Sequence, residues 1–97
     1  MKLPIDFAES AVLDMEEIRG YYADQDLPEV GVRFLLEIID LIEGLGVHPD
    51  RGRVVPEFEQ TFLRELIHPP FRIVYRRGAD KIEIVRVWRS ERLLKMP

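Results

Sequence analysis

The last third of the chain holds three short strand-like runs with brief links between them, and this arrangement leaves few folds open. The runs are predicted over residues 62–67, 71–76 and 81–89, and the links are His68-Pro69-Pro70 and Arg77-Gly78-Ala79-Asp80. Links this short join neighbouring antiparallel strands, because a parallel crossover needs about a dozen residues or more. The sequence therefore predicts a three-stranded antiparallel meander.

Two helices are predicted ahead of the meander. In the first, Ala11, Met15, Ile18 and Tyr22 recur at helical spacing, which places them on one buried face. The second helix has a longer apolar face, formed by Phe34, Leu35, Ile38, Leu41, Ile42 and Leu45. The short loop between the two helices predicts an antiparallel helical hairpin.

The ends of these elements carry recognisable signals. Asp26 is expected to cap the second helix, with Pro28 in its first turn, where a missing N–H costs nothing. Gly44 marks the end of that helix, and residues 47–55 are expected to form a loop. Residues 2–7 alternate between apolar and polar, which predicts a short N-terminal strand at a sheet edge.

The predicted order is strand, helix, helix, strand, strand, strand, which indicates the α+β class. We expect one domain over residues 1–97, with the helical hairpin packed on one face of the sheet in two layers. The opposite face of the sheet has no predicted helix to cover it. That uncovered face is where we expect a partner to bind.

Arginine recurs through all three predicted strands, and its planar guanidinium binds carboxylates and phosphates bidentately. Strand alternation places Arg86 and Trp88 on the same face as Ile82 and Ile84. We expect an open cationic face that contacts another macromolecule. The candidate contact residues are Arg64, Arg72, Arg86, Trp88, Arg89 and Arg92.

Two other interpretations of the same residues stay open. The arginines could cover apolar surface and pair with nearby carboxylates, namely Glu57, Glu59, Glu65 and Glu83. Trp88 could be a stacking platform for a base, although such a tryptophan more often lies in a core or a protein interface.

The net charge of −4 conceals a division between the two halves of the chain. Residues 1–50 contain three basic and twelve acidic residues, a charge of −9, and residues 51–97 contain eleven basic and six acidic residues, a charge of +5. The division predicts an acidic helical side and a basic sheet side. A basic patch on an acidic protein suits an acidic protein partner at least as well as it suits nucleic acid.

Several classes of site and location are disfavoured by composition. The chain has no cysteine, so neither a disulfide framework nor a thiolate metal site is expected. His48 and His68 have no second ligand at metal spacing, and we expect no metal and no cofactor. No apolar run is long enough to span a membrane, and residues 1–20 lack the apolar region of a signal peptide, so a cytoplasmic protein is expected.

The pattern resembles the RelE/ParE superfamily of bacterial toxins from type II toxin–antitoxin modules. The resemblance covers nearly the whole chain. It depends on Arg64-Glu65-Leu66, on the segments 71–75 and 82–87, and on the loop 50–57. It implies a helical hairpin on an antiparallel sheet, in agreement with the order derived above.

The resemblance implies two different activities, because RelE-like members cut mRNA on the ribosome and ParE-like members inhibit DNA gyrase without cutting nucleic acid. RelE-type sites use two lysines, two arginines and a tyrosine near the C-terminus. Arg72 matches one arginine and Arg92 the other, but Leu63 and Glu65 occupy the lysine positions, and the chain reaches Pro97 without that tyrosine. A nuclease would then need Glu57 or Glu65 as its base, with Arg72 holding the phosphate.

The expected function is therefore that of a ParE-like inhibitor of DNA gyrase, neutralised by a cognate antitoxin. An acidic antitoxin tail is expected to lie across the cationic sheet face and the helical hairpin, in a complex that can contain a toxin dimer. No binding to membranes and no sequence-specific DNA binding by the toxin alone are expected. The alternatives are a RelE-like mRNA endoribonuclease with an altered site, and an inactive homologue that only binds the antitoxin.

Overall fold

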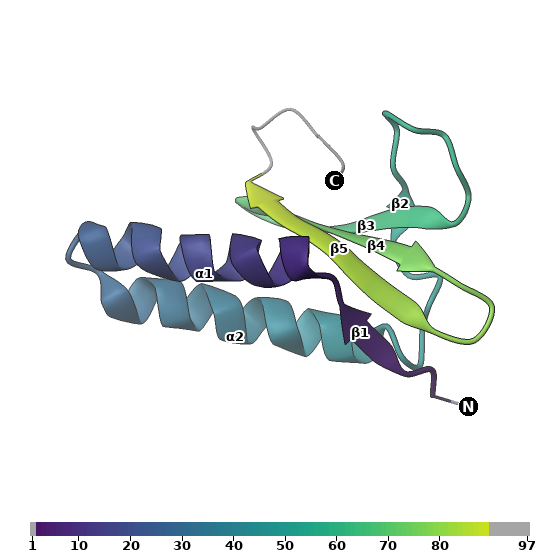
Figure 1. Cartoon of the computed structure of the whole chain (residues 1–97), viewed down its shortest axis with the longest axis horizontal. Coiled ribbons are helices and arrows are strands. Elements are labelled where there is room, and N and C mark those ends of the chain that lie inside the picture. The colour runs from purple at the N-terminus through teal and green to yellow at the C-terminus, as the bar shows by residue number, and fades with distance from the viewer. Residues whose placement is uncertain (1, 90–97) are drawn as a thin grey trace.

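The computed structural model describes residues 2–89 and consists of a helical hairpin packed against a five-stranded sheet (Figure 1). The elements in chain order are β1 (Ile5–Phe7), α1 (Glu9–Asp24), α2 (Pro28–Gly44), β2 (Arg53–Val54), β3 (Leu63–His68), β4 (Phe71–Arg77) and β5 (Ile82–Arg89). The predicted α+β class, hairpin and meander are confirmed. The two-residue strand β2 was missed, because it lies in the segment expected to be a loop.

The strand order across the sheet is β1-β5-β4-β3-β2. The meander strands β3, β4 and β5 are antiparallel neighbours, and β2 adds to β3 at one edge. At the other edge β1 pairs with β5 in parallel, from Ile5 opposite Ile82 to Phe7 opposite Ile84. The N-terminal strand therefore lies at a sheet edge, as predicted.

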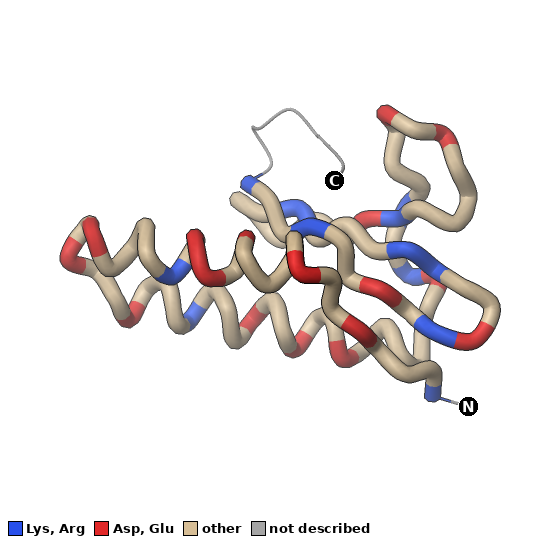
Figure 2. Tube along the Cα trace, in the orientation of Figure 1, with Lys and Arg blue, Asp and Glu red and all other residues tan. Residues whose placement is uncertain are grey.

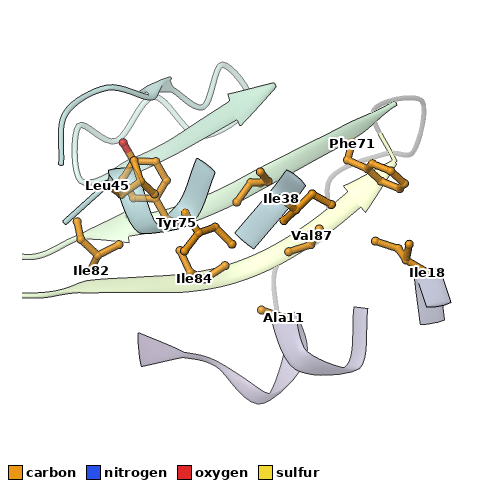
Figure 3. Close-up of a cluster of buried hydrophobic side chains, with 11 residues drawn as sticks. Ala11, Ile18, Ile38, Leu45, Phe71, Tyr75, Ile82, Ile84 and Val87 are labelled. Atoms are coloured by element: carbon orange, nitrogen blue, oxygen red, sulfur yellow. The ribbon is translucent and has the colours of Figure 1, made fainter. Parts of the chain in front are cut away.

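The main core lies between the hairpin and one face of the sheet, which we call the inner face (Figure 3). Its fully buried side chains include Ile38 of α2 and Phe71 and Tyr75 of β4. The predicted helical faces are confirmed, since every residue assigned to them is buried or partly buried in this core or packed against it. Burial of such apolar side chains contributes about 1.5–3 kcal/mol each, which fixes the hairpin on the inner face.

The start of α2 differs from the sequence prediction. Asp26 does not cap the helix: it adopts a positive φ of 61°, and the N-cap position is Leu27, without a side-chain cap. Asp26 instead closes the tight turn out of α1, a conformation that aspartate tolerates better than most residues. Pro28 begins α2 and Gly44 ends it, as predicted.

β5 contains a β-bulge that reverses the side-chain alternation within the strand. Residues 74 and 75 of β4 are adjacent, but their partners on β5, Arg86 and Ile84, are two positions apart, so Val85 is the extra residue. Ile84 faces the hairpin, whereas Arg86 faces the opposite side of the sheet. The prediction that Ile82, Ile84, Arg86 and Trp88 share one face is therefore wrong.

The outer face of the sheet, turned away from the hairpin, is not bare. The segment after β2 folds over it and forms a second, small core, in which Val55, Leu63 and Val74 are buried and Phe58 packs against them. The expectation of an uncovered face is therefore wrong over β3 and β4, although no helix of residues 2–89 lies there. No described helix has the length and apolar character needed to cross a membrane.

Candidate functional site

Arg72 lies at the centre of a chain of ion pairs on the outer face. Its Nε donates to Glu65 Oε1 at 2.7 Å, and its two terminal nitrogens donate to the carboxylate oxygens of Glu57 at 2.9 and 3.1 Å. The other oxygen of Glu65 accepts a 2.7 Å bond from Arg53 Nε. These four side chains, from β2, β3, β4 and the covering segment, form what we call the outer-face network.

The centre of the outer-face network is closed to solvent, and only its two ends are open. The side chain of Glu65 is fully buried and that of Arg72 is 8% exposed, whereas those of Arg53 and Glu57 are 61% and 41% exposed. The hydrogen bonds from Arg72 hold the pKa of Glu57 below its ordinary value, and the same bonds raise the pKa of Arg72. Both groups therefore stay charged at neutral pH and neutralise each other.

A second ion pair joins the hairpin to the edge of β5. Asp14 of α1 accepts two 2.8 Å hydrogen bonds from the Arg86 guanidinium and a 2.9 Å bond from the backbone N–H of Val87. One turn earlier on α1, Ser10 Oγ donates to the carbonyl of Val85 at 2.7 Å. β1 pairs with only the first three residues of β5. Side chains of α1 therefore take over the hydrogen bonding of that edge where β1 ends.

Trp88 is held inside the protein by the same ion pair. It is 5% exposed, and the Arg86 guanidinium carbon lies 3.9 Å from the centroid of its ring. The indole face is thus occupied by an internal cation–π contact. Of the two interpretations left open by the sequence, the buried one is correct, and Trp88 is not an open stacking platform.

A pocket of about 240 Å³ opens between the second half of α1 and the adjoining ends of β4 and β5. Arg89 donates to the Tyr22 hydroxyl at 3.3 Å, and its guanidinium carbon is 5.7 Å from the ring centroid of Tyr21. The pocket is lined by Asp14, Glu17, Ile18, Tyr21, Tyr22, Phe71, Val87, Trp88 and Arg89. Aromatic walls beside a cation suit an apolar or aromatic side chain of a protein partner.

Arg64 lies on the inner-face side of β3, where it holds the loop before β2. Its Nη1 donates to the Gly52 carbonyl at 2.9 Å, and its Nε is 3.7 Å from Asp50 Oδ1. The Tyr75 hydroxyl accepts a hydrogen bond from the Gly52 N–H and donates to the Pro49 carbonyl. A Cβ at Gly52 would lie 2.7 Å from both the Glu65 carbonyl oxygen and the Tyr75 ring. This loop therefore requires glycine at position 52.

The structure separates the predicted contact residues into different environments. Arg72, Arg86 and Trp88 share the outer face but are occupied by internal partners, Arg64 lies on the opposite face, and Arg89 lines the pocket. The expectation of one open arginine face is wrong. The alternative that the strand arginines pair with nearby carboxylates holds for Arg72, which binds Glu57 and Glu65, and for Arg76, which binds Glu83. Arg92 lies outside the described residues.

The outer-face network is poorly suited to proton transfer. Glu65 is fully buried between two arginines, and Glu57 is made less basic by Arg72. A phosphate would have to displace a carboxylate from Arg72 before it could bind there. No group of three or more His, Asp or Glu side chains within residues 2–89 is placed to hold a metal ion.

Sequence reasoning missed the carboxylates on the N-terminal half that complete these contacts. Asp14 lies on the same helical face as Ala11 and Ile18, which is an unusual place for an acidic residue. That position was the available signal for a buried ion pair. Asp50, which bonds Arg77 at 3.0 Å, carried no such signal, because its loop geometry does not follow from a sequence pattern.

Comparison with known proteins identifies a matching family. Residues 5–94 match the profile of the family described as ParE toxin of type II toxin–antitoxin system, parDE. No curated protein sequence shows significant similarity to the chain.

Two solved toxin–antitoxin structures share the fold. One is the chromosomal ParDE system from P. aeruginosa, with 23% identity, a TM-score of 0.77 and coverage of 93% of this chain and 98% of that one. The other is the RelBE2 complex from Mycobacterium tuberculosis, with 19% identity, a TM-score of 0.68 and coverage of 92% and 99%. At this level of identity the likeness shows the fold alone, and it does not separate the two activities.

Proposed function

The chain belongs to the ParE family of toxins from type II toxin–antitoxin systems, and from this premise we propose that it inhibits DNA gyrase and is neutralised by a cognate antitoxin. A toxin with this target acts in the cytoplasm by binding, without cutting nucleic acid itself. It forms a complex with the antitoxin in which a toxin dimer can be present.

The observation that carries the proposal is that Arg72 is bound internally by two carboxylates. A ribonuclease of this fold needs an accessible cation for the phosphate and separate groups to move two protons. Arg72 is buried and bound to Glu57 and Glu65, and neither carboxylate is free to act as an efficient base. Loss of one general acid or base costs on the order of 10²–10⁴ in rate, so binding to a protein target is the better-supported activity.

The contacts with gyrase are assigned to the pocket between α1 and the adjoining ends of β4 and β5. Arg89 and the aromatic pocket beside it are the candidates, whereas Arg64 holds the Gly52 carbonyl of the loop before β2. Arg72 and Arg86 act indirectly, by holding the sheet and α1 in the conformation that presents the pocket, and Trp88 forms part of the pocket wall. An acidic antitoxin tail on the outer face would have to displace carboxylates that these arginines already hold.

Two assays run in parallel test the proposal. The purified chain is added to gyrase-catalysed supercoiling and to ribosome-dependent mRNA cleavage. We expect loss of supercoiling and accumulation of linear DNA in the first assay, and intact mRNA in the second. Site-specific mRNA cuts would overturn the proposal, and so would silence in both assays with a chain that still binds its antitoxin, because that result defines an inactive homologue.

A single substitution tests where the chain contacts gyrase. Arg89→Glu is expected to reduce gyrase inhibition by about tenfold or more, as removal of a central interface arginine does. The matched control is Arg76→Glu, because Arg76 is also an arginine of the meander but pairs with Glu83 in solvent at 3.3 Å. Equal inhibition by the Arg89 and Arg76 variants would remove the pocket from the proposed contact surface.

A further inference from the structure

α2 has a second apolar surface besides the one buried in the core. Val32, Leu36 and Ile39 are 46%, 63% and 37% exposed, and their spacing of four and three residues aligns them in one stripe on the solvent side of the helix. A shallow groove runs along its first part, lined by Pro28, Glu29, Val32, Arg33, Leu36 and Glu37, and the one basic residue there, Arg33, lies 3.9 Å from the Glu37 carboxylate. A helix that is apolar on two sides usually has both sides covered, so this stripe indicates a docking surface.

The charges beside the stripe define what can cover it. Glu29, Asp40 and Glu43 lie three or four positions from stripe residues, which places them next to it, and all three are exposed. None of the three has an ion-pair partner within residues 2–89. Figure 2 shows that acidic positions are distributed along the hairpin, whereas most basic positions lie on the sheet. The surface is therefore an apolar stripe with unneutralised carboxylates beside it.

Two kinds of occupant are disfavoured by this charge pattern. A second copy of the chain, packed antiparallel about Leu36, would bring Glu29 and Glu43 at the two ends of the stripe against each other. An anionic bilayer surface would be repelled by the same carboxylates. A helix with an apolar stripe and flanking lysines or arginines matches both the apolar side chains and the charge.

We propose that the stripe formed by Val32, Leu36 and Ile39 binds a basic amphipathic helix of a partner protein. Leu36, the most exposed of the three, is the central contact, and the neighbouring carboxylates select the cationic flanks. This surface lies on the hairpin and is independent of gyrase inhibition.

Two synthetic peptides test the proposal on the whole chain. Both have leucines at positions i, i+3, i+4 and i+7; one is flanked by lysines and the other by glutamates. Fluorescence anisotropy is expected to show the lysine peptide binding at least about tenfold more tightly. Leu36→Ser together with Val32→Ser should weaken that binding by about tenfold or more, with an unchanged circular dichroism spectrum.

The control is Leu13→Ser on α1, where Leu13 is 54% exposed but lies outside the stripe; it should leave binding unchanged. A separate variant, Asp40→Lys, should weaken the lysine peptide and strengthen the glutamate peptide. Equal binding of the two peptides would overturn the proposal, as would equal sensitivity to the Leu13 and Leu36 changes.

Discussion

The outer face of the sheet and the outer face of the hairpin use their charges in opposite ways. The sheet lies mostly in the basic half of the sequence, yet arginines such as Arg72, Arg77 and Arg86 are held by carboxylates, some of which come from the acidic half. The hairpin lies in the acidic half, and carboxylates such as Glu29 and Glu43 have no ion-pair partner among the described residues. The charge that a surface offers to a partner is thus what remains after internal pairing, and it cannot be read from the sign of a segment.

The strongest test of this comparison removes a carboxylate from the outer-face network. Glu65→Ala leaves Arg72 buried with one partner and should lower the free energy of unfolding by about 3–5 kcal/mol. Urea denaturation monitored by circular dichroism measures this free energy. The hairpin counterpart, Glu43→Ala, removes an exposed and unpaired carboxylate and should change stability by less than about 0.5 kcal/mol. Similar losses for the two variants would mean that the sheet charges are not specially paired.

A somewhat smaller loss is expected where the two regions meet. Asp14→Ala removes three hydrogen bonds, to the Arg86 guanidinium and to the N–H of Val87, and should cost about 2–4 kcal/mol in the same assay. Glu16→Ala, on the exposed side of the same helix, is the control and should be close to neutral. If Asp14→Ala were equally mild, the link between hairpin and sheet edge would not be a stabilising one.

A glycine on each side sharpens the contrast further. Gly52→Ala places a methyl group 2.7 Å from the Glu65 carbonyl oxygen and should destabilise the fold by about 1–3 kcal/mol. Gly20→Ala, in α1 with nothing within 4 Å of the new methyl group, should stabilise it by about 0.5–1 kcal/mol. Thermal denaturation should therefore shift in opposite directions, and a shift in the same direction would contradict the packing described around Gly52.

The smallest expected effect is a change in stability at acid pH. In the folded protein, the bonds to Arg72 lower the pKa of Glu57 below its ordinary value of 4.5. The contribution of this carboxylate to stability is therefore complete above the unfolded pKa, and it is lost as pH falls through the folded pKa. Unfolding curves recorded from pH 7 to pH 3 should show Glu57→Gln losing less stability on acidification than the original chain. Glu29→Gln on the hairpin should follow the original chain, and the reverse ranking would contradict the pairing of Glu57.

Much of the fold follows from local patterns, whereas the pairing of side chains does not. The spacing of Ala11, Met15 and Ile18 gives a helical face by periodicity alone, and short links define the meander. Arg86 was placed on the wrong face because one extra residue, Val85, breaks the alternation, and no sequence signal marks a bulge. The partner of Arg86 is more than seventy positions away on α1, and such a contact exists only once the layers have packed.

The way α1 completes the edge of β5 has a consequence for the free toxin. An unpaired strand edge is a template on which identical chains can add and grow into fibres. Here Ser10 bonds the Val85 carbonyl and Asp14 bonds the Val87 N–H, so these two backbone groups are closed to a second molecule for as long as the helix stays in place. The contacts that hold the two layers together therefore also cover part of a strand edge on which self-templated aggregation could otherwise begin.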